Sequence, residues 1–384
     1  MRSLTRLAIG AGAILGLSAW VAPLAAGADG LPPVPHPLGN GDHVVFVQTD
    51  NTTGNQVVVY DRAGDGQLTL ANTYYTGGLG GELNGSVVDH LASQGSLAYD
   101  QRDSLLYSVN AGSNTVSVFS VRGDQLSLRQ VVSSGGAFPV SVAVHDDHVY
   151  VLNAEDGGSV QGYVSFFGRL FPIPGSRRSL GLVIPTDATQ FTNTPGQVAL
   201  SPDGSRLIVT TKQNGDDIDI FSVGAFGLLS SSPVSNHEPG TVPFAISFDA
   251  AGHLVVANAG TNALATYTLN PDDSLTLVDA VGTGASATCW VAPARGFFYA
   301  SNAGSASVSG YSDTFGGELT LLASTATDPG TVDASASSNG QFLYVQTGGN
   351  GTVDEFRVGP DGSLAEIGSV AVAGAVGGEG IAAS

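Results

Sequence analysis

The sequence predicts an all-β fold: a seven-bladed β-propeller of four-stranded blades whose ring is closed by the C-terminal strand. Seven segments share one pattern of short β-rich runs separated by Gly/Asn and Asp/Gly turns. Their aligned residues are Phe46, Tyr107, Tyr150, Ile208, Val255, Tyr299 and Tyr344. The resulting spacings are 61, 43, 58, 47, 44 and 45 residues. A period of this size, in strand patterns without helical periodicity, is typical of propeller blades.

Six of the seven segments have a further alternating run ahead of the aligned position, which supplies an innermost strand. These runs occupy residues 95–100, 140–145, 196–201, 244–249, 289–293 and 333–337. The first segment lacks such a run because residues 31–41 are rich in Pro and Gly. Residues 380–384 (GIAAS) match the missing run, so we expect the C-terminus to complete the first blade. Closing the ring in this way removes exposed sheet edges.

Composition and charge narrow the class of protein. The chain has 384 residues, of which 42% are hydrophobic and 12% charged, too apolar for a disordered protein. Its formal net charge of −20 disfavours nucleic acids and anionic membrane surfaces as partners. The single cysteine, Cys289, excludes an intramolecular disulfide and any cysteine-based zinc site. Packing and strand pairing must therefore stabilise the fold.

The N-terminal residues have the pattern of an export signal. Arg2 and Arg6 precede an apolar run at residues 7–20, and small residues follow up to Ala28. An uncleaved anchor helix is disfavoured because the run is shorter than the roughly 20 residues that span a bilayer. We therefore expect a secreted, extracytoplasmic protein with no membrane span after cleavage. The predicted division is a signal peptide at 1–28, a Pro/Gly-rich lead-in at 29–41 and one propeller domain at 42–384.

Two of the spacings are long and indicate insertions between blades. Residues 79–93 extend the passage from the first to the second blade, and residues 168–194 extend that from the third to the fourth. The second insertion contains Arg169, Arg177 and Arg178, whereas the whole chain has only 13 Lys and Arg. Loops longer than a fold requires are often functional, but some only cover the surface of the blades.

The propeller topology indicates where candidate site residues lie. The start of each innermost strand and the end of each second strand lie on one face, around the central channel. Candidate substrate-binding residues there are Gln94, Ser96, Asn110, Ser141, Asn153, Gln197, Trp290 and Asn302. Candidate catalytic residues are Lys212, which is the only lysine, Glu379, Asp333 and, in the first insertion, His90.

Each candidate also has a structural interpretation. The asparagines open tight turns, where their side chains bind backbone N–H groups. Trp290 could stack on a ring-shaped ligand or simply fill the channel, and Lys212 could be a solvated turn residue. The sequence contains no G-x-S-x-G elbow, H-E-x-x-H motif, P-loop or dinucleotide fingerprint, so we expect neither a metal nor a cofactor.

Two stretches carry a resemblance to a known family. Residues 106–119 (LYSVNAGSNTVSVF) resemble the repeat of YVTN-type propellers. Residues 198–207 (VALSPDGSRL) resemble the Ser-Pro-Asp-Gly turn of the seven-bladed lactonase family, which includes 6-phosphogluconolactonase-like and carboxymuconate-lactonising enzymes. The resemblance extends over nearly all of the chain after the signal. It implies a lactonase, which is a carboxylic ester hydrolase.

The sequence also departs from the family pattern. Residues 195–197 read Pro-Gly-Gln where family enzymes have Pro-Arg-His, Thr211-Lys212 falls where they have a Glu, and residues 95–97 read Gly-Ser-Leu instead of His-Ser-Val. Two hypotheses follow. One is an exported lactonase-like hydrolase with a rearranged site. The other is a non-catalytic propeller that binds a ligand or another protein. In either case we expect a monomer whose partner is a small-molecule ligand or an extracellular protein.

Overall fold

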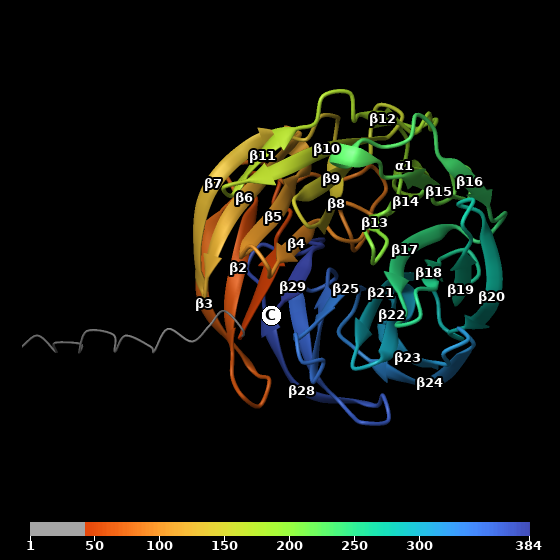
Figure 1. Cartoon of the computed structure of the whole chain (residues 1–384). Helices are drawn as coiled ribbons and strands as arrows, with labels where there is room; N and C mark the ends of the chain where they lie inside the picture. The colour runs from red at the N-terminus through yellow and green to blue at the C-terminus, as the bar shows by residue number, and fades with distance from the viewer. Residues whose placement is uncertain (1–42) are drawn as a thin grey trace, which may run out of the picture. The chain divides into compact units, whose positions relative to one another are not determined.

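A computed structural model describes residues 43–384, which form seven antiparallel sheets arranged in a ring (Figure 1). The predicted signal peptide and lead-in lie outside the described residues. Each sheet contributes one blade, and its strands run in chain order from the channel outward, except in blade 1. The predicted seven-bladed propeller is therefore confirmed. In residues 43–384, no helix is long and apolar enough to cross a membrane.

Blade 1 joins the two ends of the described chain. Its strands are β29 (Ile381–Ala383), β1 (Val44–Gln48), β2 (Gln56–Arg62) and β3 (Leu68–Tyr75). Strand β29 pairs antiparallel with β1, with Ala382 opposite Phe46. The C-terminal strand thus occupies the innermost position of blade 1, as the sequence predicts.

Blades 2 to 4 follow around the ring. Blade 2 has β4 (Leu97–Asp100), β5 (Leu105–Asn110), β6 (Thr115–Arg122) and β7 (Gln125–Ser133). Blade 3 has β8 (Pro139–His145), β9 (His148–Asn153), β10 (Ser159–Phe166), β11 (Arg169–Pro172) and the short β12 (Arg178–Ser179). Blade 4 has β13 (Val198–Leu200), β14 (Arg206–Thr210), β15 (Asp217–Ser222) and β16 (Val234–His237).

Blades 5 to 7 complete the ring. Blade 5 has β17 (Pro243–Phe248), β18 (Leu254–Asn258), β19 (Ala263–Leu269) and β20 (Leu275–Gly282). Blade 6 has β21 (Thr288–Ala294), β22 (Phe297–Asn302), β23 (Ser307–Asp313) and β24 (Leu319–Ala326). Blade 7 has β25 (Thr331–Ala336), β26 (Phe342–Thr347), β27 (Thr352–Val358) and β28 (Leu364–Ala371).

The second predicted insertion is partly a blade strand. Residues 169–172 form β11, the outermost strand of blade 3, and Arg178 in β12 pairs with Val160 in β10. The helix α1 (Gln190–Asn193), which is one turn long, lies near the end of this insertion. Only the residues after Pro172 therefore extend the blade-to-blade passage, because β11 supplies the edge pairing that β10 requires.

Strand register defines two faces of the ring. The first residue of β8, Pro139, pairs with the last residue of β9, Asn153, and Thr288 pairs with Asn302 in the same way in blade 6. We call the face with these strand starts and ends the upper face. The turns between first and second strands and between third and fourth strands form the lower face.

Buried tyrosines at the aligned positions link neighbouring blades. The hydroxyl of Tyr150 donates to Gly227 O (2.8 Å), that of Tyr299 to Gly362 O (3.0 Å) and that of Tyr344 to Gly66 O (2.7 Å). Each acceptor lies in the outer turn of the next blade. A buried Tyr hydroxyl needs such a partner, so the repeated tyrosine fixes the spacing between blades.

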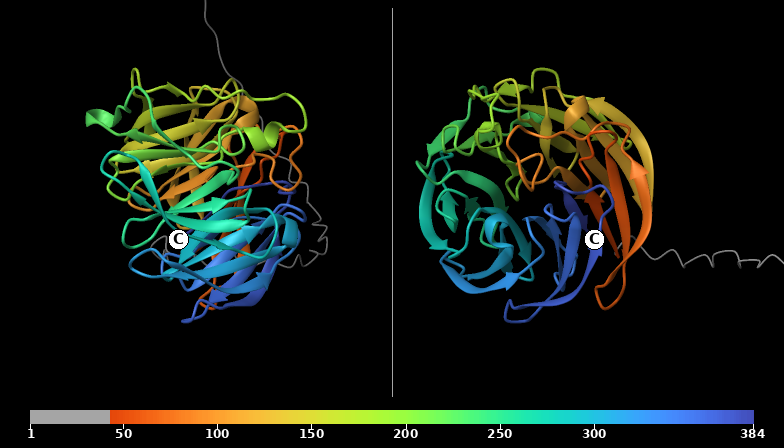
Figure 2. Two further views of the ribbon diagram at one scale, coloured as in Figure 1. Left: turned by 90° about the vertical axis from the view of Figure 1, so that its right-hand side faces the viewer. Right: turned by 180° about the vertical axis from the view of Figure 1, so that it is seen from behind.

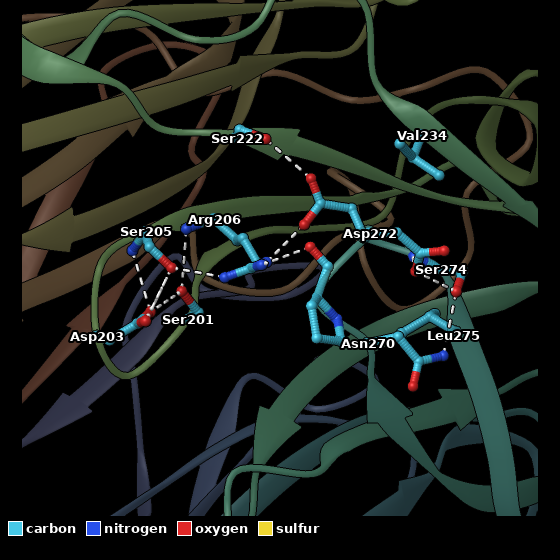
Figure 3. A network of polar contacts seen from close by, with 12 residues as sticks. Ser201, Asp203, Ser205, Arg206, Ser222, Val234, Asn270, Asp272, Ser274 and Leu275 are labelled. Carbon is cyan, nitrogen blue, oxygen red and sulfur yellow. Dashed lines mark hydrogen bonds and ion pairs between the residues drawn. The ribbon is translucent and has the colours of Figure 1, made fainter.

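The Ser-Pro-Asp-Gly turn stabilises the lower face (Figure 3). Asp203 accepts hydrogen bonds from Ser201 Oγ (2.6 Å) and Ser205 N (3.1 Å), and these bonds lower the pKa of its carboxyl to about 2. The next residue, Arg206, donates to Asp273 Oδ1 (2.6 Å), which lies in the turn between β19 and β20 of blade 5. This signature therefore shapes a turn and links blades 4 and 5.

Candidate functional site

Residues 79–96, which we call the channel segment, cover the upper end of the central channel (Figure 2). Gln94 N donates to Gly196 O (3.1 Å) of blade 4, and Gly95 O accepts from Val142 N (2.9 Å) of blade 3. His90 N donates to Gly377 O (2.8 Å), between blades 7 and 1. The first predicted insertion thus crosses the ring instead of lying along its rim.

Trp290 holds the channel segment from blade 6. Its Nε1–H donates to Ser93 O (2.6 Å), and its ring packs edge-on against Phe244 at 5.1 Å between centroids. The side chain is buried, so it fills the channel beneath the segment.

Five buried ionisable groups lie within and beneath the channel segment, and we call them the polar cluster: Asp50, Asp89, Lys212, Asp333 and Glu379. Glu379 N donates to Asp50 Oδ2 (2.8 Å), while the Glu379 carboxylate accepts from Gly95 N (3.1 Å) and Ser93 Oγ (3.3 Å). Asp89 accepts from the N–H groups of Leu91 (2.8 Å) and Ser93 (2.9 Å). The cluster therefore joins the innermost strands to the segment above them.

Asp333 and Glu379 form a carboxyl pair within the polar cluster, because their side chains are joined by a hydrogen bond. Asp333 lies in β25 and Glu379 just before β29, on adjacent blades. Burial raises the pKa of Glu379 well above its usual range, and the neighbouring charges of Asp333 and Asp89 raise it further. Burial also raises the pKa of Asp333. Two such carboxyls retain a shared proton, since both cannot ionise at close range.

Lys212 is the cation of the polar cluster. Its Nζ donates to Ala92 O (2.6 Å), Phe191 O (2.6 Å) and Thr194 Oγ1 (2.9 Å), and lies 5.2 Å from the Phe244 ring centroid. Three acceptors match the three N–H groups of an ammonium ion. Burial lowers the pKa of Lys212 and raises the pKa of its partner Asp89, so the two pKa values lie closer together than in water. Lys212 therefore ties the second insertion to the channel segment.

The remaining candidate residues make internal hydrogen bonds. Asn110 donates to Ser117 Oγ (2.8 Å), Asn153 to Ser134 O (3.2 Å) and Asn302 to Ser309 Oγ (2.9 Å). All three are fully buried, so in the described structure they brace turns. His90 is partly exposed, with Nε2 at 4.0 Å from Glu82 Oε2.

Two serines and two glutamines bond to the backbone around the channel. Ser96 Oγ donates to Glu379 O (2.8 Å), and Ser141 Oγ donates to Gln94 O (2.7 Å). Gln197 Oε1 accepts from Ile246 N (2.5 Å). The Gln94 amide pairs with both the N–H and the C=O of Val291, each at 3.0 Å. These amides satisfy backbone groups at the free edges of innermost strands.

An open cavity of about 500 Å³ lies at the lower end of the channel, between blades 6 and 7. It is lined by Gln94, residues 291–296 and residues 334–340. The strand starts indicate one lining residue, Gln94, but not the cavity itself, because the cavity is built mainly from strand ends and lower turns. The signal that could have revealed it is the run of small residues at both strand ends, as in Ser-Ala-Ser-Ser-Asn-Gly at 335–340.

The lining of this cavity is polar but carries little charge. Arg295 is the one charged residue among the described lining residues, and hydroxyls and amides come from Ser335, Ser338, Asn339 and Gln94. Among residues 43–384, no three His, Cys, Asp or Glu side chains are grouped so that they could hold a metal ion.

Comparisons with known proteins identify the fold. No family model and no curated protein sequence matches the chain. A proposed 6-phosphogluconolactonase from Bacteroides fragilis superposes with a TM-score of 0.71 at 17% identity, covering 88% of this chain and 97% of that one. The periplasmic gluconolactonase of Pseudomonas aeruginosa gives 0.68 at 16% identity, covering 88% and 98%.

A third similar structure carries a different activity on this fold. The virginiamycin B lyase of Staphylococcus aureus superposes with a TM-score of 0.53 at 12% identity, covering 76% of this chain and 88% of that one. At these identities the likeness concerns the fold, and one fold supports several chemistries. The activity must therefore be argued from the side chains in the channel.

Proposed function

We propose that this protein is an exported, lactonase-like hydrolase that opens a lactone ring inside the propeller channel. The observation that carries the proposal is the buried Asp333–Glu379 carboxyl pair, in which burial raises the pKa of both groups. The propeller fold in common with proteins named as lactonases supports it. The N-terminal signal pattern supports export, as does the periplasmic location named for one of these proteins.

Lactone hydrolysis requires a base and an acid on one substrate. Water adds to the carbonyl carbon and gives a proton to the base, and the ring C–O bond breaks as the acid protonates the leaving oxygen. In the proposed reaction, ionised Asp333 accepts the proton and protonated Glu379 donates one. The product is an open-chain hydroxy acid. Transfer of one proton from Asp333 to Glu379 then returns both carboxyls to their starting state.

Asp89 and Lys212 act on the pair in different ways. The charge of Asp89 raises the pKa of both Asp333 and Glu379. Lys212 holds Ala92 in place, and the same segment presents the Ser93 hydroxyl and Gly95 N–H to Glu379. These groups fix the orientation of the Glu379 carboxyl. Lys212 is thus a positioning residue, whereas Asp333 and Glu379 are the proposed acid–base residues.

The proposal is tested by hydrolysis of sugar, aryl and aliphatic lactones, followed as proton release by the purified protein. Glu379→Gln retains the shape of the side chain but removes the proton donor, so kcat should fall by about 100-fold or more. Asp333→Asn should act similarly. The exposed Glu366→Gln is the matched control and should leave turnover unchanged.

Thermal unfolding of each variant separates loss of chemistry from loss of folding. Loss of turnover in a folded Glu379→Gln protein supports the proposal. Absence of turnover on all three lactone classes by the folded wild-type protein would overturn it. The non-catalytic alternative then predicts calorimetric binding of a lactone without proton release.

A further inference from the structure

We propose that the cavity at the lower end of the channel is the route by which substrate reaches the carboxyl pair, and that Gln94 is its inner gate. This inference rests on the proposed function, but the route it describes is tested without catalysis. The expected site on the upper face is covered, so another route to the carboxyl pair is required.

The upper end of the channel is closed by main-chain contacts. The channel segment bonds to Gly196, Val142 and Gly377 through its backbone, and Trp290 binds Ser93 O. A side chain at Gly348 would stand 1.7 Å from Val88 O, which shows how closely blade 7 approaches the segment. Opening this end would break several hydrogen bonds at once.

Two residues that line the lower cavity are chain neighbours of groups in or around the carboxyl pair. Its lining includes Ala334, which follows Asp333 in β25, and Gln94, which lies between two residues that donate to Glu379. Gln94 is the one described residue of the channel segment that lines the cavity. Its side chain therefore forms the wall between the open space and the pair.

Gln94 has the properties of a gate because its main chain is fixed while its side chain is held by only two bonds. Gln94 N donates to Gly196 O (3.1 Å) and Gln94 O accepts from Ser141 Oγ (2.7 Å). The side-chain amide pairs only with Val291 N and O. Rotation of the side chain opens the wall without moving the segment.

The lining of the cavity suits the passage of a small polar substrate. A volume of about 500 Å³ lies within the range of small-molecule sites. Hydroxyl and amide groups suit a ring with several hydroxyls, and the described lining contains no aromatic side chain on which an aryl lactone would stack. It also contains no carboxylate, in a chain with 33 Asp and Glu, so the anionic product meets no repulsion there.

Access is tested by thiol labelling. In a Cys289→Ser background, Gln94→Cys places a thiol at the inner wall, and its reaction with methyl methanethiosulfonate is timed. Ser338→Trp narrows the cavity mouth. Ala250→Trp, in the corresponding exposed turn of blade 5 outside the lining, is the matched control.

We expect the thiol to react in the control background and to react at least 10-fold more slowly with Ser338→Trp. Equal rates in the two backgrounds, or no reaction in either, would overturn the access route. Where sugar lactones are hydrolysed, Ser338→Trp should lower kcat/KM at least 10-fold, and unchanged kcat/KM would overturn the route while leaving the activity intact. Without any turnover the proposed function fails, and labelling alone decides the route.

Discussion

Asp50 illustrates how one buried carboxyl makes stability depend on pH. It accepts hydrogen bonds from Gln48 Nε2 (2.6 Å) and Glu379 N (2.8 Å), but burial dominates and raises its pKa from 3.8 to about 8. Between these values the folded protein binds a proton that the unfolded chain has released. Stability therefore falls as pH rises through this window, by at most about 1.4 kcal/mol per pH unit from this one group.

We predict that Asp50→Asn flattens the decline in the free energy of unfolding between pH 5 and 8, because the amide is uncharged throughout. The measurement is urea denaturation across that pH range. Asp156→Asn is the matched control, since Asp156 is exposed in the corresponding turn of blade 3 with nearly the same backbone φ, 54° against 53°. An unchanged slope in Asp50→Asn would show that Asp50 is ionised in the folded protein.

Part of the polar cluster is predictable from the sequence. Asp333 and Glu379 were identified because they lie at the starts of innermost strands, and Lys212 because it is the only lysine and follows the end of a second strand. Asp50 occupies the position equivalent to Lys212, two residues after the end of β1, but was missed because the other candidates were taken from the strand starts and ends themselves. Asp89 was missed because it lies in an insertion, where no repeat constrains the path. The partners of each amide could not be predicted either, since Gln94 reaches Val291 across the ring, 197 residues along the chain.

The channel segment is the element on which the upper face depends. Trp290 Nε1 is the side-chain donor that reaches the buried Ser93 O of this segment. We predict that Trp290→Phe keeps the packing against Phe244 but leaves this carbonyl without its partner. Such a loss costs about 1–3 kcal/mol, measured by urea denaturation.

Tyr75→Phe is the control for Trp290→Phe, because this aromatic side chain is 71% exposed and its truncation should leave stability unchanged. Equal stability of Trp290→Phe and the wild-type protein would mean that the segment is held by its main chain alone. The insertion itself was predicted from blade spacing. Its course over the channel was not, because a single crossing leaves no periodic signal in the sequence.

The whole ring depends on closure by its last strand. Repeat counting predicted this because seven equivalent segments left one innermost strand missing at the start and one spare at the end. The structure adds the contacts: Ser384 N donates to Val44 O (3.0 Å), Arg62 Nη2 donates to Ser384 O (2.9 Å), and Ala383 N donates to Ser335 Oγ (3.0 Å) of blade 7. Strand β29 therefore ties blade 1 to blade 7.

We predict that deletion of residues 379–384 destabilises the entire propeller by about 5 kcal/mol. Several backbone hydrogen bonds contribute about 1 kcal/mol each, and burial of Ile381 contributes about 2 kcal/mol. Ser384→Ala, which retains the strand, should cost only about 1 kcal/mol. Hydrogen exchange distinguishes the outcomes: closure of the ring requires that protection also falls in blades 3 to 5, far from the deletion. Loss confined to blades 1 and 7 would mean that the blades are stabilised by their neighbours alone, as in an open repeat array.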